Sequence, residues 1–154
     1  MDLLTSEEDQ WYETRFDINL LTQRLIATTN WATRQPQIQH LPMGYFGAST
    51  GAAAALQAAA AIGSSISAIV SRGGRPDLAG GKLSLIQSPV LLIVGGNDFD
   101  VIKLNEAAFN HLSCIKELTL VPNATHLFEE PGTLEKVAFL ASQWFEKYMP
   151  ESSC

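Results

Sequence analysis

The stretch from Gly44 to Leu56 constrains the fold of this chain more than any other. It reads Gly-Tyr-Phe-Gly-Ala-Ser-Thr-Gly-Ala-Ala-Ala-Ala-Leu and contains the pattern Gly-x-Ser-x-Gly at 47–51. The apolar run at 43–46 is typical of a short buried strand, and the alanine-rich run to Ile62 favours a helix. Strand, tight turn and helix are the context in which this pattern forms a nucleophile elbow.

Each position of the predicted elbow has an expected role. Ser49 is the candidate nucleophile, held on a strained turn. We expect Gly47 and Gly51 to lie so close to neighbouring backbone that a Cβ atom would clash. Thr50 opens the helix, and its backbone N–H is the candidate oxyanion-hole donor. The same pattern also occurs in Gly/Ser turns that close ordinary βα units, so the assignment depends on partners for Ser49.

Length and charge limit the classes of protein to consider. The chain has 154 residues, 46% of them hydrophobic, which predicts a single domain over 1–154 with a sizeable core. A formal net charge of −6 and the lack of a Lys/Arg cluster argue against nucleic acid and anionic membranes as partners. The longest apolar run, 51–62, is too short to span a bilayer. The acidic amino-terminal stretch has no apolar core of the kind found in signal peptides.

Cysteine and histidine usage is sparse. The chain has 2 cysteines, Cys114 and Cys154, in no Cys-x-x-Cys pattern. This usage predicts a reducing cytoplasmic location without disulfides. The 3 histidines are scattered at spacings that match no metal site, so no metal is expected.

Helical and strand patterns alternate along the chain. Strands are predicted at 41–46, 66–71, 89–94 and 116–121, and helices at 16–34, 50–62, 101–112 and 131–148; a loop with one short helix is expected at 72–88. The strands are apolar throughout, which indicates a sheet covered on both faces. The predicted fold class is therefore α/β, with a parallel sheet of about four strands in sequential order.

Three polar residues follow the carboxyl ends of predicted strands, where the active sites of open α/β sheets lie. They are Ser49, Asp98 and His126, and their order along the chain is that of α/β-hydrolase triads. In this reading His126 accepts the proton of Ser49 and later activates water. Asp98 orients the imidazole and stabilises its charged form.

Other residues compete for roles at the same edge. Asp100 is an alternative acid, but it is better placed to cap the helix that follows, which favours Asp98. Arg72 and Arg75 also follow the end of a strand. They either bind an anionic substrate or are ordinary loop arginines.

Four segments together resemble one branch of a known family: 47–51 (Gly-Ala-Ser-Thr-Gly), 71–78 (Ser-Arg-Gly-Gly-Arg-Pro-Asp-Leu), 91–98 (Leu-Leu-Ile-Val-Gly-Gly-Asn-Asp) and 124–131 (Ala-Thr-His-Leu-Phe-Glu-Glu-Pro). They are similar to the dienelactone-hydrolase-like α/β hydrolases over nearly the whole chain. The resemblance implies an esterase triad of Ser49, Asp98 and His126 and no cofactor. Authentic dienelactone hydrolases carry a cysteine where this chain has Ser49.

In that family the elbow follows several strands, of which residues 1–4 could form only a stub. We therefore expect a domain truncated at its amino terminus, with the edge of strand 41–46 open, Tyr45 or Phe46 exposed and the second oxyanion donor missing. The open edge predicts a homodimer or pairing with the missing segment. The segment 72–88 is too short for a lid, which predicts an open, shallow pocket.

Two functions follow from these features. The first is a serine hydrolase that cleaves small carboxylic esters or lactones through an acyl-enzyme. The alternative is a catalytically impaired, truncated hydrolase that acts as a fragment or interaction module.

Overall fold

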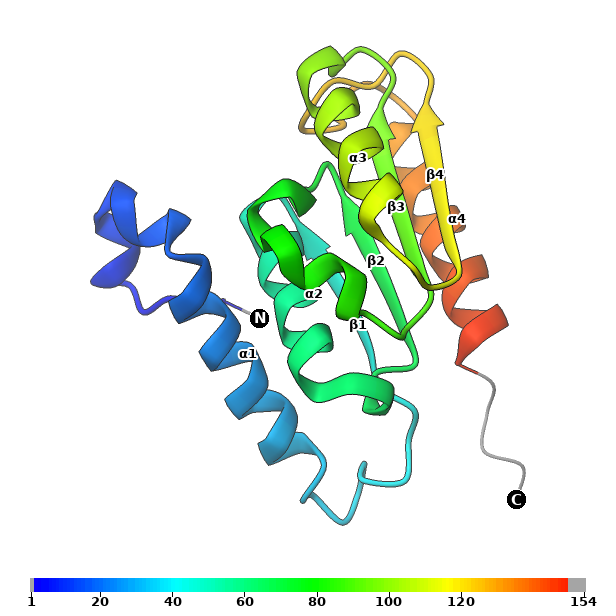
Figure 1. The fold of residues 1–154 in the computed structure, drawn as a ribbon. Coiled ribbons are helices and arrows are strands. Elements are labelled where there is room, and N and C mark those ends of the chain that lie inside the picture. Colours follow the sequence, from blue (N-terminus) through cyan, green and yellow to red (C-terminus); the bar gives the residue numbers. More distant parts are fainter. Residues whose placement is uncertain (1, 150–154) are drawn as a thin grey trace.

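The computed structural model describes residues 2–149, which contain one parallel sheet. Its strands are β1 (Gly44–Ala48), β2 (Ala68–Arg72), β3 (Val90–Gly95) and β4 (Lys116–Val121), in the order β1-β2-β3-β4 (Figure 1). Each strand pairs in parallel with the next in the sequence, which short crossover connections favour. The predicted parallel α/β sheet is confirmed.

Helices cover both faces of this sheet (Figure 1). The α-helices are α1 (Ile18–Ala32), α2 (Thr50–Ile62), α3 (Phe99–His111) and α4 (Thr133–Tyr148). Short 3₁₀ helices are η1 (Glu8–Gln10), η2 (Tyr12–Phe16), η3 (Gly63–Ser65) and η4 (Pro76–Leu85). Helices α2 and α3 lie on one face, with α1 outside against α2, and α4 lies on the other.

The central strands alternate between two apolar cores. In β2, Ile69 packs with α2 and α3, whereas Val70 packs with α4. In β3, Leu92 belongs to the first core, and Leu91 and Ile93 belong to the second. Successive side chains of a strand point to opposite faces, so a sheet covered on both sides needs apolar residues at every position. This requirement explains the apolar runs of β2 and β3. The edge strand β4 contains Lys116, Glu117 and Thr119 and is only partly buried, so the prediction of strands apolar throughout is wrong there.

Several element boundaries differ from the predicted ones for local reasons. β1 begins at Gly44 and not at residue 41, because a turn over 35–41 and Pro42, which lacks an N–H, precede it. α1 begins at Ile18 and not at residue 16, because the Asp17 side chain caps it by accepting from the Leu20 N–H at 3.0 Å. α4 begins at Thr133, after Gly132 in a left-handed conformation (φ 80°).

β1 is an edge strand and, within residues 2–149, pairs only with β2. The Phe46 side chain is 51% exposed there, whereas Tyr45 is buried and its hydroxyl lies 2.6 Å from Thr29 Oγ1. Burial raises the pKa of Tyr45. Of the two aromatic residues expected at this edge, Phe46 is the exposed one.

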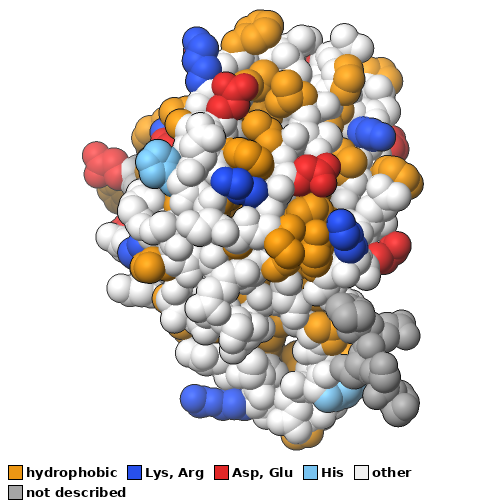
Figure 2. All heavy atoms as spheres, turned by 45° about the vertical axis from the view of Figure 1, so that its right-hand side comes forward, with side chains coloured by type: hydrophobic (Ala, Val, Ile, Leu, Met, Phe, Trp, Pro, Cys, Tyr) orange, Lys and Arg blue, Asp and Glu red, His pale blue; other side chains and the backbone are white. Residues whose placement is uncertain are grey.

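The molecular surface carries charges of both signs. Figure 2 shows one face on which lysines and arginines lie among acidic and apolar side chains. Among the helices of the described range, none is long and apolar enough to span a membrane. No cluster of three or more His, Cys, Asp or Glu side chains between residues 2 and 149 could hold a metal ion.

Candidate active site

Ser49 joins β1 to α2 in a strained conformation, with φ 49° and ψ −123°. Its N–H donates to the Arg72 carbonyl at 3.3 Å, and its own carbonyl accepts from the N–H groups of Ala52 and Arg75, both at 3.2 Å. A positive φ is uncommon outside glycine and is retained where the surroundings impose it. The local geometry is therefore that of an elbow between a strand and a helix.

The two glycines of the elbow differ in what surrounds them. A Cβ added at Gly47 would lie 2.6 Å from Ala52 Cα and 2.7 Å from the Gly51 carbonyl oxygen. A Cβ added at Gly51 would meet no atom within 4 Å. The expected close approach is found at Gly47, but at Gly51 the prediction is wrong, because that Cβ would lie in open space.

An open cleft of about 460 Å³ lies beside Thr50 and Gly51. Its other walls come from the amino-terminal segment and from α1, with Leu3, Leu4, Leu21, Asp9 and Arg15 among the lining residues. Asp9 and Arg15 form an exposed ion pair at 2.8 Å. Thr50 is the first residue of α2, so its N–H precedes the first intrahelical hydrogen bond and is free to meet an anion.

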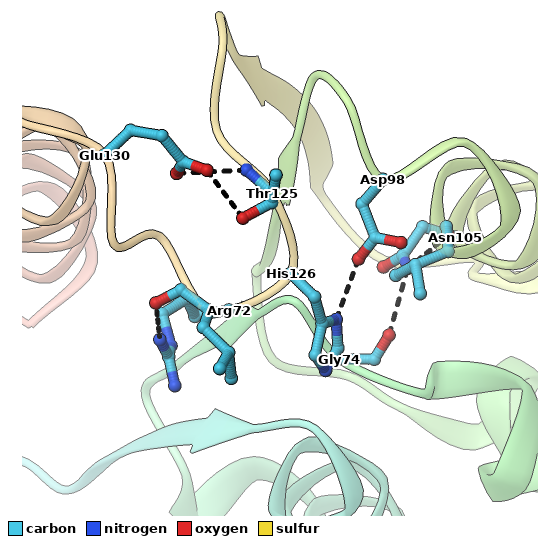
Figure 3. Close-up of polar contacts among 9 residues, drawn as sticks. Arg72, Gly74, Asp98, Asn105, Thr125, His126 and Glu130 are labelled. Atoms are coloured by element: carbon cyan, nitrogen blue, oxygen red, sulfur yellow. Dashed lines mark hydrogen bonds and ion pairs between the residues drawn. The ribbon is translucent and has the colours of Figure 1, made fainter.

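His126 and Asp98 come together from different loops at the carboxyl end of the sheet (Figure 3). His126 Nδ1 lies 2.7 Å from Asp98 Oδ2. The Asp98 side chain is 15% exposed and the His126 side chain 40%. A carboxylate at Nδ1 holds the proton on that nitrogen, which leaves Nε2 as the imidazole's proton acceptor.

The two aspartates at the start of α3 have different surroundings. Asp98 occupies the N-cap position but makes no capping bond with its side chain, which is turned toward His126. Asp100 lies in the first turn, 96% exposed and 3.8 Å from Lys103 Nζ. The predicted capping role of Asp100 is therefore wrong, because α3 begins at Phe99, two residues before the expected start.

Ser49 and His126 adjoin the same short segment of chain. The Ser49 N–H bonds the Arg72 carbonyl, and a Cβ added at the next residue, Gly73, would lie 3.2 Å from the His126 carbonyl oxygen and 3.7 Å from His126 Cε1. No hydrogen bond joins the Ser49 and His126 side chains within the part of the chain that the structure describes. The structure thus pairs His126 with Asp98 and places Ser49 nearby. The catalytic roles of all three stay predictions.

The loop that carries His126 is held by side chains that the sequence analysis did not single out. Glu130 accepts from the Thr125 N–H at 3.1 Å and from the Thr125 hydroxyl at 2.6 Å (Figure 3). The Thr125 hydroxyl bond is the main reason that the pKa of Glu130 lies below its ordinary value. Phe128, buried with φ 58°, anchors the same loop. The sequence signal was a polar Thr-to-Glu pair within one loop, which spacing rules for helices and strands do not detect.

The two predicted substrate-binding arginines both have protein partners. Arg72 donates to the Leu127 carbonyl at 3.4 Å, and its guanidinium lies 5.6 Å from the centre of the Phe128 ring. Arg75 forms a two-pronged ion pair with Asp77 at 2.9 and 2.8 Å, which raises the pKa of Arg75. These contacts are those of loop arginines. A role for either residue in substrate binding stays a prediction.

Comparison with solved structures gives the family. The chain aligns with the crystal structure of dienelactone hydrolase from Anabaena variabilis at a TM-score of 0.91 and 54% sequence identity, covering 96% of this chain and 70% of that one. The chain belongs to the dienelactone hydrolase family. No family model matches the sequence.

More distant structures share the fold of this dienelactone hydrolase relative. Est1E from Butyrivibrio proteoclasticus aligns at a TM-score of 0.73 and 15% identity, over 89% of this chain and 72% of that one. An α/β serine hydrolase without lid from Xanthomonas campestris aligns at 0.69 and 20% identity, over 88% and 60%. The chain therefore has the α/β-hydrolase fold that the sequence predicted.

The curated relatives are longer proteins with a different name. A Mycobacterium tuberculosis protein named "Putative phosphoribosyl transferase", found in strains H37Rv and CDC 1551, is 57% identical over 144 residues. The match covers 94% of this chain and 32% of that protein. The chain thus spans about a third of the length of the curated relatives that it matches.

Proposed function

We propose that this member of the dienelactone hydrolase family hydrolyses small carboxylic esters or lactones through an acyl-enzyme formed on Ser49. One observation carries the proposal: the His126 Nδ1 to Asp98 Oδ2 contact of 2.7 Å. The strained turn at Ser49, with φ 49°, supports it. A nucleophile, a base and a group that orients the base are the parts that this chemistry needs.

The proposed reaction proceeds in two halves. Ser49 Oγ attacks the ester carbonyl carbon while His126 Nε2 takes the hydroxyl proton, and the oxyanion that forms faces the Thr50 N–H. The tetrahedral intermediate then expels the alcohol, which receives the proton from His126 and leaves the acyl group on Ser49. In the second half His126 takes a proton from water while the hydroxide attacks the acyl carbon; the bond to Ser49 then breaks, His126 returns the proton to Ser49 Oγ, and the acid leaves. Asp98 holds the imidazole in place through both halves and stabilises the imidazolium.

The size of the surrounding segments supports a small substrate. Between β2 and β3 lies the short helix η4 (Pro76–Leu85), and that segment adds no further element above the site. The cleft of about 460 Å³ reaches Thr50 and Gly51 but is not lined by Ser49, Asp98 or His126, so it is proposed only as the place for the part of the substrate beyond the ester group. Its leucines suit the apolar part of an ester.

The name of the Mycobacterium tuberculosis relatives describes another reaction, and this chain matches 32% of their length. We assign hydrolase chemistry to the matched part, because that part contains the elbow and the His126–Asp98 pair. The proposed location is the cytoplasm, and no cofactor is assigned.

The alternative is a catalytically impaired hydrolase that keeps Ser49, Asp98 and His126 but does not turn over substrate, and that acts as a fragment or interaction module. The β1 edge supports it, since Phe46 is 51% exposed and the outer side of β1 has no strand beside it within residues 2–149. We propose that this edge pairs with a further strand. That strand comes either from additional polypeptide, such as the longer relatives contain, or from a second copy of this chain. A strand from such further chain, unlike one from a second copy, would also bring the second oxyanion donor, whose loss typically costs about 10²–10³-fold in rate.

The test is hydrolysis of p-nitrophenyl acetate by the purified chain, with Ser49→Ala and His126→Ala as variants and light scattering to record the assembly state. Turnover that both variants abolish supports the hydrolase. Wild-type protein that is folded but no faster than the variants supports the alternative. Turnover confined to dimers would show that a second copy supplies the strand that pairs with the β1 edge.

A further inference from the structure

Asn105 is a fully buried polar residue on α3 (Phe99–His111). Its Nδ2 donates to the Gly74 carbonyl at 3.0 Å and to the Val101 carbonyl at 2.8 Å. Its Oδ1 is buried without a hydrogen-bond partner among residues 2–149. An unpaired buried acceptor lowers stability, so packing alone would favour an apolar residue here. The side chain's distinctive contribution is its bond to Gly74.

Gly74 is the middle residue of a connector, Gly73–Gly74–Arg75, that follows β2. The Arg75 N–H donates to the Ser49 carbonyl at 3.2 Å. A Cβ added at Gly73 would lie 3.2 Å from the His126 carbonyl oxygen and 3.7 Å from His126 Cε1, and the Gly73 N–H donates to the Ile93 carbonyl at 2.7 Å. Asn105 binds Gly74 from the helix whose N-cap is Asp98 (Figure 3). The connector therefore bonds to Ser49 and to the helix of Asp98, and it passes close to His126 at Gly73.

The connector leaves no room for a side chain at Gly74. Gly73 has φ 49°, which disfavours other residues. A Cβ added at Gly74 would overlap Ser71 Oγ and would lie 2.7 Å from Ala52 Cβ, in the first turn of α2. β2 and α2 thus confine Gly74 on one side, while Asn105 fixes its carbonyl on the other.

We propose that Asn105 is a positioning residue that, through this connector, sets the distance between Ser49 Oγ and His126 Nε2. The proposal rests on the proposed function. The nucleophile comes from the β1–α2 turn, the acid from the start of α3 and the base from the β4–α4 loop, so their mutual distances depend on contacts between separate elements. Asn105 supplies the side-chain bond that ties α3 to the connector. Misplacement of reacting groups by about 1 Å can cost about 10²-fold in rate.

The test compares Asn105→Leu, which has similar size but no donor, with wild type in rapid mixing with p-nitrophenyl acetate. The burst amplitude counts active sites, and the burst rate constant reports acylation at each site. We expect the rate constant to fall about 10- to 100-fold while the amplitude and KM stay near the wild-type values. A purely structural role would lower the amplitude and leave the rate constant unchanged, and that result would overturn the proposal.

A second pair of variants tests the connector itself. Gly74→Ala should slow acylation in the same way, because its Cβ displaces the connector. Gly81→Ala is the matched control in η4, where an added Cβ meets no atom within 4 Å, and it should acylate at the wild-type rate. Wild-type rates in both Gly74→Ala and Asn105→Leu would contradict the proposal.

An inactive wild type would refute the proposed function separately. The positioning role would then be decided by crystal structures of wild type and Asn105→Leu. A change of about 1 Å in the distance from Ser49 Oγ to His126 Nε2 supports it, at the scale where positioning matters. An unchanged distance overturns it.

Discussion

Replacing Asp98 by asparagine removes one charge and leaves the shape of the side chain intact. In the structure Asp98 Oδ2 lies 2.7 Å from His126 Nδ1, and the carboxylate is mostly buried. The asparagine amide can donate to Nδ1, which moves the imidazole proton to Nε2. With its proton there, His126 cannot accept the proton of Ser49.

The expected loss in kcat is about 10⁴-fold, the effect of the same change in a serine protease triad, which corresponds to about 5.4 kcal/mol in the activation barrier. Folding should change little. Asp98 occupies the N-cap of α3 without a capping bond from its side chain, and asparagine caps helices as well as aspartate does. We expect the free energy of unfolding to stay within about 1 kcal/mol of wild type.

Asp100→Asn is the matched control in the same turn. The Asp100 side chain is 96% exposed and lies 3.8 Å from Lys103 Nζ, a surface contact worth about 0–1 kcal/mol of stability. Its kcat should equal that of wild type. The assay is p-nitrophenyl acetate hydrolysis, with urea denaturation of each variant alongside. Two results would refute the assignment of the acid. One is an Asp98→Asn variant that keeps more than about a tenth of wild-type kcat, because the loss of a triad carboxylate lowers kcat far more than that. The other is an inactive Asp100→Asn variant.

Two further predictions concern stability. Gly47→Ala should lose about 1–3 kcal/mol in the free energy of unfolding, because its Cβ would lie 2.6 Å from Ala52 Cα. Gly51→Ala should gain up to about 1 kcal/mol, because that site in α2 is open. Equal urea midpoints for the two variants would contradict this prediction. Hydrogen bonds to Glu8, first of all from Arg24, lower its pKa from 4.5 to about 2. The stabilisation from Glu8 is therefore fully present above pH 4.5 and is lost as the pH falls toward 2, so the stability deficit of Glu8→Gln should shrink over that range in urea titrations. A deficit that stays constant with pH would show that ionisation of Glu8 is not the cause.

Much of the fold follows from residue pattern. The apolar strands predict a sheet covered on both faces, and the alanine run predicts α2 at Thr50–Ile62, the bounds that the structure has. Boundaries set by single polar contacts are less predictable. The Asp17 cap moves the start of α1, and the start of α3 at Phe99 assigns the N-cap to Asp98.

The candidate site also has features that the sequence predicts and features that it does not. Chain order at the strand ends predicts that Asp98 and His126 meet, because the carboxyl ends of parallel strands share one edge of the sheet. The contacts of Asn105 and Glu130 depend on how loops pack in three dimensions, and no periodicity reports that packing. Asn105 does leave one signal, because it is a polar residue on the buried side of α3, which it shares with Ala108.

The central claim is that Ser49 is an activated nucleophile, and covalent labelling by a fluorophosphonate probe tests it most directly. Intact mass spectrometry and peptide mapping should find one adduct per chain, on the peptide that contains Ser49. Ser49→Ala should show no adduct and should unfold at nearly the same urea concentration as wild type. An adduct on another serine, or one that persists in Ser49→Ala, would contradict the account.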